Sequence, residues 1–213
     1  RLLDPHVFGL LLARLGGTER VSRSTNPYDT LAPGQFIVVR RDVYDRAGGH
    51  EAVRAHVAED LRLAQEWTRL GYSVQMVAGI DEMTTRMYEG FGEIWRGWGK
   101  NVWAAGRDTM PATPALQALF RVLAPLVPLW EVAPAVALAL ARAGAASAAV
   151  GAWGAITYTI GTLFWIVLRR VFRAPARHAL LHPVAACVVS AMLARASWRG
   201  SRVEWKGREY LSR

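Results

Sequence analysis

The chain has 213 residues, of which 52% are hydrophobic and 20% charged, and its mean hydropathy is positive at +0.13. Its net charge of +9 could suggest a nucleic-acid partner, but the basic residues of the second half flank apolar runs, and residues 1–108 do not interleave them with aromatic side chains. We therefore exclude nucleic acid and favour a membrane surface. The single cysteine, Cys187, excludes an internal disulfide.

Acidic residues are distributed unevenly along the chain. Only Glu131, Glu204 and Glu209 lie beyond residue 108, whereas apolar runs lengthen after Pro111. This asymmetry predicts three parts. Residues 1–108 form a mixed domain, residues 109–196 form a membrane region with two or three hydrophobic segments, and residues 197–213 form a basic cytoplasmic tail.

Short segments of alternating type predict an α/β fold for the first part. Residues 35–40 are a β-branched run typical of a buried strand, and residues 72–78 alternate in the way a second strand does. Between them, apolar residues recur at helical spacing over 61–70. This helix begins at the acidic pair Glu59-Asp60 and ends at Gly71.

Residues 86–105 combine a helical apolar stripe with tryptophan, arginine and lysine. Four glycines interrupt the segment, and each costs a helix about 1 kcal/mol relative to alanine, so such a helix must pack against something. Tryptophan beside basic side chains suits the headgroup layer of a bilayer. The sequence therefore predicts an interfacial helix here.

The second half contains three apolar runs. Residues 116–141 carry three prolines and form a kinked span or two shorter pieces, while residues 143–168 have no charge and form the clearest transmembrane helix. The third run, 179–194, is interrupted by His182-Pro183 and is a tilted span, a re-entrant segment or an interfacial helix. With residues 1–108 in the cytosol, the positive-inside rule favours a non-spanning third run in a multi-pass protein of the cell membrane.

A series of spaced motifs lies between residues 34 and 101. Read in order, this series resembles the membrane-bound branch of the family-two inverting glycosyltransferases, and within it the hopene-associated and carotenoid glucosyltransferase-like enzymes. The motifs are Gly-Gln with an apolar run, Arg-Arg, Gly-Gly-His, Glu-Asp-x-x-Leu-Ala, Gly-Tyr-x-Val, Arg-Met-Tyr and Glu-x-Trp-x-Gly-Trp-x-Lys-Asn.

The resemblance implies a GT-A fold in which Asp60, with Glu59 beside it, is the catalytic base. An inverting transfer is one in-line displacement, so a carboxylate must take the proton of the attacking hydroxyl. Taken alone, the acidic pair could equally be a helix cap.

Further residues are expected to bind the acceptor or the diphosphate. Arg96 and Trp98 stand near the position of the family's Gln-x-x-Arg-Trp motif, although Glu93 replaces the glutamine and one extra residue separates the pair. An arginine suits a departing diphosphate, but an interfacial Arg and Trp could also serve only as anchors. The other expected binding residues are Gln35, His50 and Lys100, and His50 could instead cap a turn.

The family's first half carries an Asp-x-Asp motif for a divalent metal on the donor diphosphate. No Asp-x-Asp occurs in this sequence. We therefore expect the chain to be the C-terminal, acceptor-side part of an enzyme, inactive alone. The metal, Mg²⁺ or Mn²⁺, is expected through the missing N-terminal half, with none bound by this chain.

The expected function is transfer of a sugar, most plausibly glucose from a UDP-sugar, to the hydroxyl of a polyisoprenoid, hopanoid, carotenoid or ceramide-like lipid. The alternative is a non-catalytic, membrane-anchored interaction subunit. A transporter would place ionisable residues in the clearest span, and residues 143–168 have none.

Overall fold

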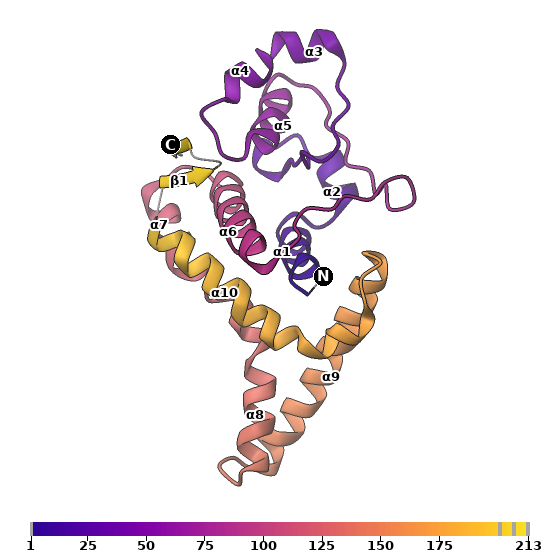
Figure 1. Ribbon diagram of the computed structural model, residues 1–213, viewed down its shortest axis with the longest axis vertical. Coiled ribbons are helices and arrows are strands. Elements are labelled where there is room, and N and C mark those ends of the chain that lie inside the picture. The colour runs from indigo at the N-terminus through magenta and orange to yellow at the C-terminus, as the bar shows by residue number, and fades with distance from the viewer. Residues whose placement is uncertain (1, 200–201, 206–207, 212–213) are drawn as a thin grey trace. The chain divides into compact units, whose positions relative to one another are not determined.

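The structure, a computed structural model, describes residues 2–199, 202–205 and 208–211. It divides into two compact units (Figure 1). The apolar unit contains the residues up to Leu10 together with Arg121–Ala194, and the polar unit contains Leu11–Phe120 together with the residues from Arg195 onward. Helix α1 (Asp4–Leu15) begins in the apolar unit and ends in the polar unit.

The polar unit is built from helices joined by extended segments, and its last element is a small hairpin. Its strands β1 and β2 pair antiparallel. The elements are α2 (Thr18–Arg23), the 3-10 helix η1 (Pro27–Asp29), α3 (Arg41–Arg46), α4 (Gly49–Val53), α5 (Glu59–Arg69), α6 (Phe91–Asp108), the first residues of α7 (Pro114–Leu123), β1 (Arg202–Trp205) and β2 (Arg208–Leu211).

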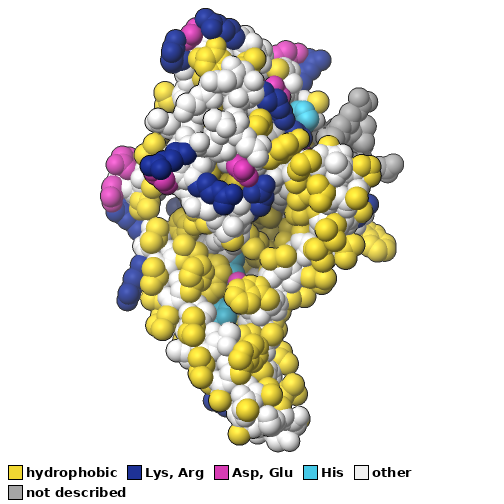
Figure 2. Space-filling view, turned by 180° about the vertical axis from the view of Figure 1, so that it is seen from behind, with side chains coloured by type: hydrophobic (Ala, Val, Ile, Leu, Met, Phe, Trp, Pro, Cys, Tyr) yellow, Lys and Arg dark blue, Asp and Glu magenta, His cyan; other side chains and the backbone are white. Residues whose placement is uncertain are grey.

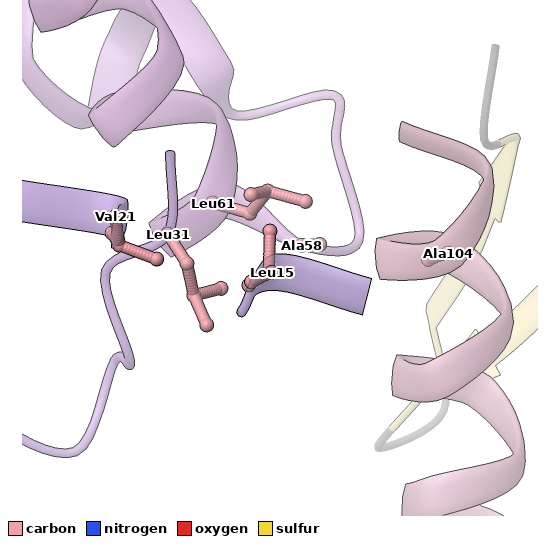
Figure 3. Close-up of a cluster of buried hydrophobic side chains, with 6 residues drawn as sticks. All are labelled: Leu15, Val21, Leu31, Ala58, Leu61 and Ala104. Atoms are coloured by element: carbon pink, nitrogen blue, oxygen red, sulfur yellow. The ribbon is translucent and has the colours of Figure 1, made fainter. Parts of the chain in front are cut away.

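Helix α5 is the centre of the polar unit because its side chains enter two hydrophobic clusters. Acidic residues occupy its first turn and Gly71, with φ of 82°, follows its end, as the sequence predicts. Figure 3 shows the first cluster, in which α5 contributes Leu61 and α6 contributes Ala104. Its members are Leu15, Val21, Leu31, Ala58, Leu61 and Ala104.

The second cluster lies on another side of α5 and buries Leu63, Ala64 and Trp67. Side chains from α3 and α4, Val43 and Val53, complete it together with Ala32. Burying a large apolar side chain contributes about 1.5–3 kcal/mol. The two clusters therefore fix the position of α5, and with it the residues of its first turn.

The predicted strands 35–40 and 72–78 do not form a sheet, so the α/β prediction, and with it the GT-A expectation, is wrong. Residues 35 and 36 lie in an exposed turn, whereas residues 37–40 and 72–77 have no regular secondary structure and their side chains alternate between half-buried and exposed. Ile37, Val39, Tyr72 and Val74 pack onto the second cluster. The alternation thus reflects an extended chain lying on helices. A strand needs backbone partners, and within the described residues the only sheet is the hairpin β1–β2.

The core of the apolar unit is an antiparallel pair of helices, α8 (Ala133–Arg142) and α9 (Ala148–Val171). A Cβ atom on Gly154 would lie 2.8 Å from the Pro134 carbonyl oxygen and 2.9 Å from the Leu138 nitrogen. The glycine therefore allows the two backbones to approach closely, as small residues do between membrane helices.

Among the described residues, two segments are long and apolar enough to cross a membrane, or three if the bent pair Pro114–Glu131 and Ala133–Arg142 counts as one span. The first is α9, and the second, Ala176–Arg199, joins the 3-10 helix η3 (Ala176–Leu181) to α10 (His182–Arg199). Figure 2 shows hydrophobic side chains gathered over α8 and α9. These helices suggest membrane association. The third apolar run is longer than the sequence indicated, because His182-Pro183 does not interrupt it: η3 continues directly into α10, which begins at His182.

The first apolar run is bent. Pro114–Glu131, which contains α7 and the 3-10 helix η2 (Val127–Glu131), meets α8 at an angle of 47°. Proline lacks the backbone N–H that a helix interior needs, so Pro125, Pro128 and Pro134 account for the break. The bend of 47° agrees with either of the two alternatives expected from the sequence, a kinked span or two shorter pieces.

Candidate functional site

Asp60 lies in the first turn of α5, where two backbone groups hold its half-buried carboxylate. The Gly34 N–H donates to Oδ2 at 2.7 Å, and the Leu61 N–H donates to Oδ1 at 2.7 Å. Each carboxylate oxygen can accept more than one hydrogen bond. The group is therefore fixed in orientation and can still accept the proton of a bound hydroxyl.

Contacts between neighbouring loops lead from this carboxylate to α6. Gln35 follows the glycine that binds Asp60, and its Nε2 donates to the sulfur of Met87 at 3.5 Å. The next residue, Tyr88, lies edge-on to Trp98 with ring centroids 5.9 Å apart. Three residues expected from the motif series, Asp60, Gln35 and Trp98, thus belong to one connected region of the polar unit.

Basic side chains gather beside Trp95 on α6. Arg96 is exposed, and within the part of the chain that the structure describes no carboxylate pairs with it. The Arg195 guanidinium lies 5.8 Å from the centre of the Trp95 ring and close enough to Arg96 and Arg199 for the charges to repel. Cations without a nearby acid attract an anion. Sequence reasoning had identified Arg96 but missed Arg195, which is 99 positions away in the chain.

A buried ion pair joins α5 to the end of α6. No sequence motif predicted this pair. Arg62 reaches Asp108 twice, from Nε to Oδ2 at 3.2 Å and from NH2 to Oδ1 at 2.9 Å, and the Asp108 side chain is 4% exposed. Gln65 donates from Nε2 to the Asp108 carbonyl at 2.8 Å. A polar residue at every third position of an otherwise buried helix was the only sequence signal.

His56 precedes α5 and lies near this ion pair. Burial lowers the pKa of its imidazole, and the positive charge of Arg62 lowers it further. Protonation of His56 is therefore disfavoured in the folded chain.

The remaining expected residues are His50, Glu59 and Lys100. His50, on α4, is bonded to the Tyr44 hydroxyl on α3 through Nδ1 at 2.7 Å, which is the local turn contact rather than a contact to the site. Glu59 is exposed at the start of α5. The side chain of Lys100 lies outside the described residues.

Residues expected to hold a metal were placed outside this chain. Among the residues that the structure describes, no group of three or more His, Cys, Asp or Glu side chains could hold a metal ion. The described side chains therefore do not fit a divalent metal, and no step of the chemistry below involves one.

The apolar unit contains a buried polar cluster of its own. The Glu131 carboxylate accepts hydrogen bonds at Oε2 from Trp165 Nε1 at 2.8 Å and from His182 Nδ1 at 3.0 Å. The His6 ring stacks on Trp165 with centroids 3.7 Å apart, and its Nε2 lies 3.6 Å from the same oxygen. Glu131 was visible in the sequence as an isolated acid in an apolar run, but its partners were not.

Comparison with known proteins adds one finding. The family model described as glycosyl transferase family 21 matches residues 29–213, which include Gly34, Asp60, α6 and the apolar helices. No curated protein and no solved structure matches the chain. The match confirms the glycosyltransferase prediction at the level of the family, without distinguishing the inverting branch. The chain belongs to glycosyl transferase family 21.

Proposed function

We propose that this protein contributes the acceptor side of an inverting glycosyltransferase, with Asp60 as the base. The observation that carries the proposal is the Asp60 carboxylate, which is held by two backbone N–H groups at the start of the central helix. A base acts well when it is fixed within hydrogen-bond reach of the proton it removes. Family membership supplies the reaction class.

In the proposed step, the acceptor hydroxyl oxygen attacks the anomeric carbon of the donor sugar. The new carbon–oxygen bond forms as the bond from that carbon to the diphosphate oxygen breaks, and the hydroxyl proton passes to the Asp60 carboxylate. The nucleoside diphosphate leaves with the bonding electron pair. One displacement inverts the anomeric centre.

The leaving group gains negative charge, and Arg96 is suited to stabilise it. Its guanidinium is exposed and has no carboxylate partner among the described residues. Arginine binds phosphate oxygens through charge-assisted, bidentate hydrogen bonds. Trp98, joined to Tyr88 at the ring edge, would border the same region.

We propose a membrane lipid as the acceptor and a UDP-sugar, with glucose as its sugar, as the donor. Two segments are able to cross a bilayer, and large apolar side chains on α9 such as Ile156, Ile160 and Leu163 are each more than half exposed. An enzyme anchored in this way can receive a polyisoprenoid, hopanoid, carotenoid or ceramide-like alcohol directly from the bilayer.

The test is a transfer assay on the full-length protein in membranes, with radiolabelled UDP-glucose and vesicles containing a hydroxylated carotenoid or ceramide. Asp60→Asn keeps the size of the side chain but removes the base, and we expect activity to fall by at least about 100-fold. Asp45→Asn is the matched control, because Asp45 is an exposed carboxylate on α3 whose ion pair among the described residues is with Arg41.

Asp60→Asn protein that transfers sugar as fast as the unmodified protein would contradict the assignment of the base. Loss of transfer in both aspartate variants would show a general folding defect and would also count against it. A full-length protein that transfers no sugar from any nucleotide donor would favour the alternative, a membrane-anchored interaction subunit.

We further propose that α9 ends at the cytoplasmic face. Arg170, Arg173 and Arg177 follow its apolar stretch, and cytoplasmic loops carry such basic residues. In a Cys187→Ser background, Arg177→Cys should react with a membrane-impermeant maleimide only in inside-out vesicles. Labelling only in right-side-out vesicles would reverse the orientation.

A further inference from the structure

Gly34 approaches Asp60 more closely than any side chain would allow. A Cβ atom at this position would lie 2.8 Å from Oδ2 and 3.2 Å from the Cβ of Asp60. The backbone of Gly34 is not in the left-handed region, since its φ is not among the positive values in the chain. Close approach to Asp60, rather than an unusual backbone conformation, is therefore the reason for glycine here.

The two hydrogen bonds to Asp60 come from different segments of the chain. Leu61 belongs to α5 itself and moves with it, whereas Gly34 belongs to the turn at residues 33–36, before α3, and is 26 positions away from Asp60. A bond from the neighbouring residue alone leaves one oxygen of the carboxylate unrestrained. The Gly34 bond restrains the second oxygen and so fixes the plane of the group.

The residues around the contact between Gly34 and Asp60 differ in how far they are buried. Gly34 is exposed and Asp60 is half-buried, whereas Ala32 and Leu61 beside them belong to the two hydrophobic clusters. The segments are thus anchored on the buried side, and the carboxylate is presented at the surface. The contact orients the group without removing it from a substrate.

We propose that Gly34 is a positioning residue that holds the Asp60 carboxylate in its reactive orientation. The inference rests on the proposed function, because it assigns Gly34 a role through the base. It does not make Gly34 a catalytic residue, since its contact is with Asp60 rather than with the reacting atoms.

The test compares two glycine substitutions in the full-length protein, assayed with radiolabelled UDP-glucose and vesicles containing a hydroxylated carotenoid or ceramide. Gly34→Ala places a methyl group against Oδ2, and we expect kcat to fall by about 100-fold, as for a misplaced catalytic group. The KM for UDP-glucose should stay within about two-fold, because the role proposed for Gly34 acts on Asp60 rather than on donor binding. Gly79→Ala is the control, since a Cβ there would meet only Glu82 at 3.6 Å, and its kcat should be unchanged.

Testing Gly34→Ala in a protein that already carries Asp60→Ala distinguishes a positioning role of Gly34 from a general structural role. In an Asp60→Ala protein the carboxylate is gone, so adding Gly34→Ala should change the residual activity by less than about two-fold. An equal fold-loss in both backgrounds would overturn the inference. So would a Gly34→Ala protein with unchanged kcat.

Comparing Gly34→Ala with the double variant also distinguishes a folding defect from a catalytic one. If Gly34→Ala alone does not fold, the Gly34→Ala, Asp60→Ala double variant should fold, because the clashing group has been removed. A double variant that also fails to fold contradicts the inference. If Asp60→Asn retains full activity, it is the proposed function that fails, whatever Gly34→Ala does.

Discussion

Gly97 lies on the face of α6 that receives Tyr88. A Cβ atom at this position would overlap the Tyr88 ring, whereas a Cβ on Gly92, in the first turn of the same helix, would only touch the Arg96 guanidinium at 3.4 Å. The two glycines are therefore alike in sequence context and different in surroundings. Only at Gly97 does the contact with the Tyr88 ring require a glycine.

This difference predicts opposite effects on stability. Gly97→Ala should lower the free energy of unfolding by about 1–3 kcal/mol, because the Tyr88 ring must move away from Trp98. Gly92→Ala should leave stability unchanged or raise it by up to about 1 kcal/mol through helix propensity. Thermal unfolding in detergent measures both, and equal effects of the two substitutions would contradict the contact.

His56 predicts a pH dependence of stability. Burial and the charge of Arg62 lower the pKa of its imidazole, so the unfolded chain binds a proton more readily than the folded chain. Stability is then complete above the ordinary value of about 6.5 and decreases as the pH falls below it.

The measurement is the unfolding midpoint at pH 7.5 and at pH 5.5 for the unmodified protein and for His56→Gln. Glutamine has no titratable group, so the variant should lose less stability between the two pH values than the unmodified protein does. An identical loss in both proteins would assign the pH dependence to other groups.

At the level of elements, the ion pair between Arg62 and Asp108 couples α5, which carries Asp60, to α6, which carries Arg96 and Trp98. The pair is bidentate and nearly excluded from water. Arg107 also approaches this carboxylate, from NH2 to Oδ1 at 3.4 Å. Removing Arg62 leaves the buried Asp108 with only this longer contact, at a cost of up to about 3–5 kcal/mol, the value for a wholly uncompensated buried charge.

We therefore expect Arg62→Met to lower the unfolding free energy by several kcal/mol and to reduce transfer activity along with it. The double variant Arg62→Met, Asp108→Leu should recover part of the loss, because the buried carboxylate that Arg62 neutralises is removed with it. Arg41→Met, which breaks an exposed pair with Asp45, is the matched control and should cost at most about 1 kcal/mol. A double variant less stable than Arg62→Met would contradict this account.

The helices α5 and α6 could be predicted from sequence because their signals are local: periodic apolar residues, acids in the first turn and, for α5, a terminal glycine. That residues 35–40 and 72–78 form no sheet could not be predicted, because alternation in residues 72–78 is the same whether an extended chain pairs with a strand or lies on helices. Contacts such as Gly34 with Asp60 or Arg195 with Trp95 join residues far apart in sequence, and no single-sequence pattern encodes that distance.

At the scale of the whole molecule, a buried polar cluster lies in the apolar unit, where the side chains of His6, Glu131 and His182 are 3%, 13% and 2% exposed. His6, Glu131, Trp165 and His182 come from α1, η2, α9 and the start of α10. Four separate segments thus share one carboxylate oxygen. Ionisable groups in such surroundings persist only when they are paired.

Glu131→Leu should therefore lower the thermal midpoint in detergent more than Glu131→Gln does. Glutamine still offers an oxygen to the Trp165 N–H, whereas leucine leaves that donor and His182 without their acceptor, at about 1–3 kcal/mol for each group. Leu129→Ala, in the same short helix but partly exposed, should have the smallest effect. A leucine variant as stable as the unmodified protein would show that the cluster does not hold these segments together.

The close contact at Gly154 also bears on the order in which the chain assembles during synthesis. Helices α8 and α9 are consecutive and only residues 143–147 separate them, so their pairing requires little loop closure. They can pair as soon as both have left the ribosome, before residues 176–199 have been made. The hydrogen bond between Glu131 and His182 would then form last, when α10 packs against the hairpin that α8 and α9 have already made.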